Sequence, residues 1–110
     1  MQIQLKKQDG VDMIALEGDL DYHCSAELRT QFDKLVEGQS PKILINLQDV
    51  SYLDSSVLAN FVELSQKMRR YGGKMAFSNL SEKVQYIFDL AKMDLFFSIA
   101  KTSQEALKLL

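Results

Sequence analysis

The feature that most constrains this fold is a short apolar run, "KILINL" at residues 42–47, followed closely by a long amphipathic pattern. The run is almost continuously apolar, which is typical of a central strand covered on both faces. In "VLANFVELSQKMRRY", residues 57–71, apolar side chains recur at steps of four, three and four. That spacing predicts a helix with one apolar stripe. A buried strand followed by such a helix indicates an α/β domain with parallel strands.

The other segments alternate in the same way. The first 18 residues predict a β-hairpin turning at Asp9-Gly10, and residues 19–38 have helical spacing that stops at Gly38. Four further elements are expected: a strand at 74–80, a helix at 81–93, a strand at 95–100 and a short helix at 102–110. In the last strand we expect the Phe96-Phe97 pair to be buried in the core, with an interface as the alternative. The order is β-β-α-β-α-β-α-β-α. We therefore expect one α/β domain over residues 1–110, with a mostly parallel mixed sheet and right-handed crossovers.

Composition and charge exclude several classes of protein. The net charge is −2 and the basic residues are scattered, which argues against direct nucleic-acid binding. The densest basic cluster, Lys67 with Arg69 and Arg70, falls at the end of a predicted helix, where it complements the helix dipole. No apolar run approaches the roughly 20 residues that span a bilayer, so we expect no membrane insertion. The single cysteine, Cys24, allows no internal disulfide and suits a reducing compartment, which predicts the cytoplasm.

The sequence offers no recognisable catalytic set. Neither GxGxxG nor a Walker-type loop is present, and one histidine with one cysteine is too few for a zinc site. His23 and Cys24 are adjacent and point in different directions on a helix, so we expect a partly buried capping histidine and a small core cysteine. We therefore expect no enzyme activity, no catalytic residues, no metal and no cofactor. One catalytic alternative stays open, in which an acidic run at Glu17, Asp19 and Asp21 works with Asp54.

The junction between the buried strand and the amphipathic helix, which we call the seam, consists of Asp54, Ser55 and Ser56. Each is a preferred helix N-cap, worth about 1 kcal/mol over alanine. One cap needs only one side chain, so the seam carries a surplus hydroxyl at the carboxyl end of a central strand, where α/β sheets place functional residues. Phosphorylation there would add about −1.5 to −2 charge beside Asp54 and could disrupt a partner contact.

Two stretches together resemble the STAS domain, the fold of bacterial anti-anti-sigma factors, also called anti-sigma factor antagonists. They are "INLQDVSYLDSSVLANFVELSQKMRRYGGKMAFSNL" and the upstream "ALEGDLDYHCSAEL". In that family the serine directly after the aspartate is the phosphoacceptor. Carried over by position, the resemblance implies that Ser55 is phosphorylated, that Asp54 is its charged neighbour and that Asp21 lies close by. Ser56 is then expected to be the helix cap.

The resemblance also implies a partner-switching mechanism. Such a protein, when unphosphorylated, binds an anti-sigma factor that is also an ATP-dependent serine kinase, and the sigma factor is released. Phosphorylation of the serine by that kinase breaks the complex, and a PP2C-like serine phosphatase restores it. The STAS protein itself is a ligand and a substrate, and catalyses nothing.

Val57 departs from the family pattern, which usually has glycine at that place. Valine either extends the apolar stripe of the helix and packs inward, or alters the surface that a kinase meets. The second possibility keeps an alternative open. In that alternative the chain is a constitutive STAS subunit of another assembly, such as a lipid-transport complex, or a nucleotide-binding STAS module, and it is not phosphorylated.

Overall fold

One five-stranded sheet organises the chain, and the computed structural model describes all residues, 1–110. The strands lie in the order in which they occur, β1-β2-β3-β4-β5. They are β1 (Gln2–Gln8), β2 (Val11–Leu20), β3 (Lys42–Leu53), β4 (Lys74–Ser78) and β5 (Ser98–Ala100). The helices are α1 (Tyr22–Glu37), α2 (Ser55–Arg69), α3 (Glu82–Leu90) and α4 (Ser103–Lys108), with a 3₁₀ turn η1 (Met93–Leu95). β1 runs antiparallel to β2 and all other neighbours are parallel, which confirms the predicted mixed α/β fold.

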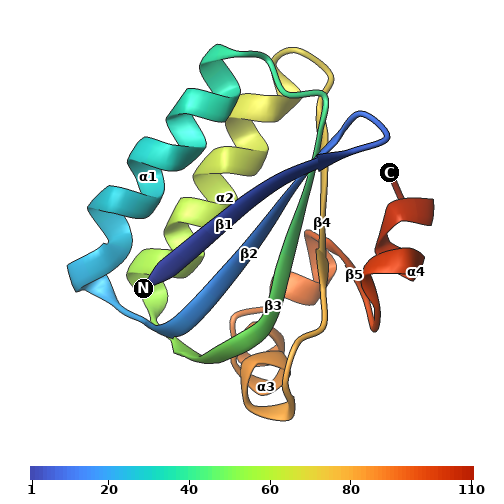
Figure 1. Cartoon of the computed structure of the whole chain (residues 1–110). Helices are drawn as coiled ribbons and strands as arrows, with labels where there is room; N and C mark the ends of the chain where they lie inside the picture. The colour runs from blue at the N-terminus through green and yellow to red at the C-terminus, as the bar shows by residue number, and fades with distance from the viewer.

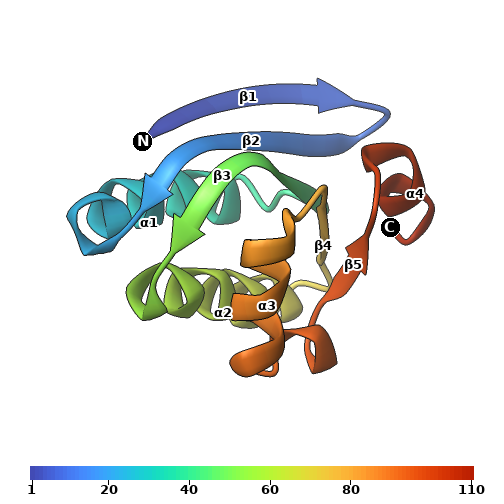
Figure 2. The ribbon, with the colours of Figure 1, turned by 90° about the horizontal axis from the view of Figure 1, so that it is seen from below.

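The central strand β3 is covered on both faces, as its apolar run predicts. Ile43, Ile45 and Leu47 belong to the main core, between the sheet and the helices α1 and α2. Leu44 points to the other face, where it packs with Ala76 of β4 and Ala106 of α4. Figures 1 and 2 show this layering, with α1 and α2 side by side on one face and α4 at the opposite side.

Helix α2 carries the predicted apolar stripe. The four side chains of the stripe, those of Val57, Phe61, Leu64 and Met68, are all buried. Phe61 lies at the centre of an aromatic cluster, with its ring centroid 5.0 Å from that of Phe77 and 6.0 Å from that of Phe32. On the outer side, Glu63 accepts a 2.6 Å hydrogen bond from Arg29 of α1. The helix begins at Ser55, two residues earlier than the pattern predicts, because Asp54 serves as its N-cap.

The helices are amphipathic rather than uniformly apolar. Helix α1 buries Cys24, Leu28 and Phe32 and exposes most of its charged side chains, so the prediction that Cys24 is a small core residue is confirmed. None of the helices combines the length and the apolar character that a membrane span requires.

The segment 95–100 differs most from the prediction. The helix expected to reach residue 93 ends at Leu90, residues 93–95 form η1, and the strand expected from residue 95 is limited to Ser98–Ala100. Lys92 adopts a left-handed conformation with φ 58°, and the N–H groups of Phe96 and Phe97 both donate to Met93 O. This tight turn sends the two phenylalanines in different directions. Phe97 is 8% exposed, as expected, but the expectation that Phe96 is buried is wrong, because it is 65% exposed.

Candidate functional site

Two helices begin beside each other at the carboxyl ends of β2 and β3. Leu20 and Leu53 are paired near the ends of these parallel strands, and the chain enters α1 or α2 directly after each of them. The N-cap residues of the two helices are Asp21 and Asp54. Figure 1 shows the two helix starts at the same end of the sheet.

Asp54 connects these two helix starts through its carboxylate. Oδ1 accepts hydrogen bonds from the N–H groups of Ser56 at 3.0 Å and Val57 at 3.3 Å, and from the Ser56 hydroxyl at 2.6 Å. Oδ2 accepts from the N–H of Tyr22, the first residue of α1, at 3.1 Å. The prediction that Ser56 caps α2 is therefore wrong. Asp54 has the extended backbone of a cap, with φ −109°, whereas Ser56 already lies within the helix and supports the cap by donating to it.

Asp21 lies close to Asp54 without a direct hydrogen bond between them. Its Oδ1 accepts from the N–H of His23 at 2.9 Å and lies 3.2 Å from the Nδ1 of the same residue. The residues on either side of Asp21 both contact Asp54, because Tyr22 donates to its carboxylate and Leu20 O accepts from its N–H at 3.1 Å. His23 belongs to the cap, as expected, but it is exposed rather than partly buried.

The environment of Asp54 favours its charged form. Partial burial alone raises the pKa of the carboxyl, but hydrogen bonds from the Ser56 hydroxyl and from the N–H groups of Val57, Ser56 and Tyr22 outweigh burial and hold the pKa below its ordinary value. The carboxylate is thus negatively charged at neutral pH. It places a fixed charge beside the hydroxyl of Ser55.

We expect the Asp54→Ala variant to lose about 2 kcal/mol of unfolding free energy at pH 7, because a helix cap and the bridge to Tyr22 disappear together. Since the folded-state pKa of Asp54 is lowered, its stabilisation is present above the unfolded pKa of about 4 and is lost as the pH falls through the folded value. The stability difference between wild type and variant should therefore shrink below about pH 4. This difference in unfolding free energy can be measured by urea unfolding, followed by circular dichroism, at several pH values between 3 and 7.

Two control variants distinguish the stability that comes from capping the helix from the stability that comes from the charge of the Asp54 carboxylate. Asp54→Asn keeps a good capping side chain, so most stability should remain at pH 7. Ser81→Ala removes the cap that binds Val84 N–H at the start of α3, and its cost should be independent of pH. An Asp54→Ala deficit that stays constant from pH 3 to pH 7 would contradict a role for the carboxylate charge.

Ser55 and Ser56 differ in what their hydroxyls do. Ser56 is half-buried and its hydroxyl is bound to Asp54, whereas Ser55 is exposed and its hydroxyl makes no hydrogen bond within the chain. The surplus hydroxyl that the sequence indicates is therefore that of Ser55. It is the one that a second protein can reach without breaking the cap.

Val57 does not face this surface. Its side chain is fully buried in the main core, and its N–H donates to the Asp54 carboxylate. Val57 therefore extends the apolar stripe of the helix and packs inward. The residue that stands in the place of the family's glycine therefore presents no side chain to a partner.

The acidic run does not assemble into one site. Asp19 binds the hydroxyl of Ser51, Asp21 caps α1, and Glu17 is exposed on β2. No three His, Cys, Asp or Glu side chains of the chain are grouped as metal ligands. The arrangement gives no support to the catalytic alternative built on these acids.

Two exposed tyrosines lie close in sequence to Asp21 and Asp54, the caps of the two helices, and sequence reasoning missed them. Tyr22 is 66% exposed at the first position of α1, and Tyr52 is 40% exposed two residues before Asp54. Lys83 at the start of α3 lies 5.4 Å from the centroid of the Tyr52 ring. Their adjacency to the aspartates in the sequence was a usable signal, because large aromatic side chains next to a seam often serve as contact residues.

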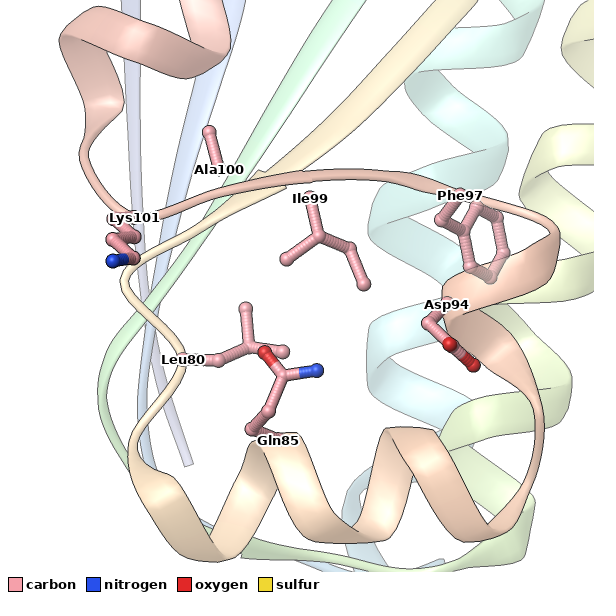
Figure 3. Close-up of a pocket in the computed structure, with 7 residues that line it drawn as sticks. All are labelled: Leu80, Gln85, Asp94, Phe97, Ile99, Ala100 and Lys101. Carbon is pink, nitrogen blue, oxygen red and sulfur yellow. The ribbon is translucent and has the colours of Figure 1, made fainter.

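A polar hollow lies elsewhere, between α3 and β5. Its volume is about 380 Å³, and its lining includes Leu80, Gln85 and Ile99. Its charged residues are Asp94 and Lys101, which Figure 3 shows at opposite ends of the lining. A lining with one lysine and one acidic residue offers little net positive charge and is therefore a poor phosphate-binding site. The hollow contains neither Asp54 nor Ser55, so it is separate from the helix-start site.

Fold and site together define a small α/β domain that presents a reachable serine, with exposed tyrosines, where its central strands end. The sequence model of the STAS domain family matches residues 2–106. The chain belongs to the STAS domain family.

Individual relatives agree with this membership. The anti-sigma-B factor antagonist of Bacillus subtilis (strain 168) is 28% identical over 104 residues, 94% of this chain and 94% of that one. The anti-sigma F factor antagonist of Paenibacillus polymyxa is 28% identical over 92 residues, covering 83% of this chain and 79% of its own length. The crystal structure of a candidate anti-sigma factor antagonist from Thermotoga maritima aligns with a TM-score of 0.91 and 25% identity, over 96% of this chain and 92% of that chain.

Proposed function

We propose that this protein is an anti-sigma factor antagonist that is switched by phosphorylation of Ser55. In its unphosphorylated form it binds an anti-sigma factor that is also a serine kinase, and so releases a sigma factor. Phosphorylation breaks this complex, and a PP2C-like phosphatase restores it. The protein acts as ligand and substrate, and we place this role in the cytoplasm, which suits its single free cysteine.

The observation that carries the proposal is the exposed, unbonded hydroxyl of Ser55 beside the charged carboxylate of Asp54. The names of the two curated relatives support the function, since both are anti-sigma factor antagonists. The exposed tyrosines add contact area of the kind that binding surfaces use as anchors.

The chemistry needs a partner, because no side chain near Ser55 is placed as its base. The kinase would transfer the γ-phosphoryl group of ATP to the Ser55 oxygen, the P–O bond to ADP would break, and a base of the kinase would take the hydroxyl proton. Exposure of Ser55 at the first turn of α2 makes the oxygen reachable for such an in-line transfer.

Incubation with the cognate kinase and ATP should add one phosphoryl group to wild type, read as a mass increase of the intact protein and located by peptide fragmentation. Ser55→Ala should remain unmodified. Ser56→Ala should still be modified, since its hydroxyl is committed to Asp54 and is the matched control one residue away. Equal labelling of the Ser55→Ala variant would refute the assignment.

Affinity capture of the protein from its native cells, followed by mass spectrometry, distinguishes the proposed switch from the constitutive-subunit alternative. A serine kinase among the captured proteins supports the proposal. Capture of a transporter assembly without any kinase contradicts it. Burial of Val57 removes the one sequence observation that favoured that alternative.

A further inference from the structure

A second surface lies at the other end of α2, away from Ser55. Helix α2, the turn after it, the residues that directly follow η1 and Leu109 near the C-terminus enclose a groove, which we name the α2–η1 groove. Its lining includes Val62, Ser65 and Arg69 of α2, Lys74, Phe96 and Leu109. The main hollow measures about 300 Å³, with a smaller one of about 70 Å³ adjoining it along α2.

The groove exposes apolar side chains that the fold holds in place. Phe96 is 65% exposed and Leu109 is 50% exposed. Leu95, the last residue of η1, lies outside the lining and is 76% exposed. Phe97 fixes this segment, because its buried ring packs edge-on against Phe77 with centroids 4.9 Å apart. The exposure of Phe96 is therefore a consequence of a well-anchored turn. Exposed apolar clusters of this kind mark interaction surfaces.

The charge of the groove is opposite to that of the whole protein. Acidic residues outnumber Lys and Arg by 15 to 13 in the chain, but the lining holds Arg69 and Lys74 and no acid. None of the five ion pairs of the structure uses either cation. Both charges are thus available to a ligand, and they favour an acidic one.

We propose that the α2–η1 groove binds an acidic amphipathic helix of a partner protein. An apolar side chain of the helix would occupy the hollow beside Phe96, and its carboxylates would face Arg69 and Lys74. A hollow of this size accepts a side chain, and binding of a helix in such a groove through spaced apolar anchors is a recurrent mode of recognition. Anionic membranes fit less well, because they are attracted by clusters of about four to eight cations and the lining has two.

This surface is independent of the proposed switch. Ser55 and Arg69 stand at opposite ends of α2, about 20 Å apart along the helix axis. A protein bound in the groove would therefore leave the Ser55 surface open. The domain could hold a kinase and a second, acidic partner at the same time.

The test uses the full chain, labelled with ¹⁵N, and a synthetic helical peptide with leucines spaced three and four residues apart and glutamates elsewhere. Titration should shift the amide signals of Val62, Ser65 and Arg69, and fluorescence anisotropy should give the affinity. Two variants, Phe96→Ser and the double variant Arg69→Glu with Lys74→Glu, should each weaken binding at least tenfold. The matched controls Leu90→Ser and Lys34→Glu change exposed residues outside the groove and should leave the affinity within about twofold.

Several outcomes would overturn the proposal. They are equal binding of a peptide with lysines in place of the glutamates, self-association of the chain that Phe96→Ser abolishes, and binding to phosphatidylglycerol vesicles without binding to the peptide. The Ser55→Asp variant should bind the peptide like wild type. Failure of the groove proposal therefore leaves the proposed switch untouched, and loss of the switch leaves the groove result standing.

Discussion

Replacing Ser55 with aspartate is expected to weaken the complex with the kinase partner at least about 100-fold, or about 2.7 kcal/mol. The new carboxylate would stand next to that of Asp54, whose pKa is already lowered, so two negative charges would meet the partner where it met one. A partner surface that accommodates a neutral hydroxyl would have to desolvate the added charge and bear the repulsion.

The same substitution should change the stability of the free protein little. Ser55 is the first residue of α2, where the helix dipole stabilises a negative charge by about 0.3–1 kcal/mol. Repulsion from Asp54 opposes this gain, and exposure of the site screens both effects. The loss of affinity would therefore arise at the interface and not from unfolding, which is what a reversible switch requires.

Isothermal titration of the purified kinase with each variant measures the effect. Ser55→Ala and Ser55→Asn are neutral controls and should bind within about fivefold of wild type, because they add no charge. Protein phosphorylated at Ser55 should bind at least as weakly as the aspartate variant, since the phosphate carries more charge. Wild-type affinity in the phosphorylated protein would contradict the switch.

Much of the fold was predictable because its strongest patterns are local. The apolar run of β3 and the stripe of α2 each determine one element and the faces that it buries, and the structure confirms both. The alternation of strand and helix then restricts the sheet to a mostly parallel one, as observed. These inferences need only the period of the hydrophobic pattern.

The details that the sequence left open depend on contacts between distant residues. Asp54 caps α2 through local bonds, but its carboxylate also accepts from the N–H of Tyr22, which is 32 residues away in the chain and which only the folded sheet brings to it. Phe96 and Phe97 have the same apolar character, and the left-handed turn at Lys92 decides which of them is buried. Composition and periodicity carry no information about either feature.

Geometry also shows how the fold serves the proposed switch. Because β2 and β3 are parallel neighbours, α1 and α2 start at the same edge, and Asp54 can bond to both helix starts at once. The carboxylate is thereby fixed in place, and the neighbouring Ser55 is held outward on the rigid first turn of α2. A pre-positioned hydroxyl lowers the entropy cost of recognition by a kinase.

Val57→Gly is expected to destabilise the protein by about 3 kcal/mol, even though it restores the residue usual in the family. The isopropyl group of Val57 is fully buried in the core, and its removal costs about 2 kcal/mol of apolar burial. Glycine adds about 1 kcal/mol through its greater freedom in the unfolded chain. The midpoint of thermal unfolding should fall by roughly 10–20 °C.

The kinase affinity of the folded Val57→Gly variant should stay within about threefold of wild type, because the valine side chain does not reach the surface. The comparison must be made well below the lowered melting temperature. Val57→Ala separates the two causes, since it removes most of the buried volume without the glycine backbone and should retain about a third of the lost stability. A glycine variant that bound the kinase more than tenfold tighter at unchanged stability would show that position 57 shapes the interface, and would reopen the alternative that Val57 alters the choice of partner.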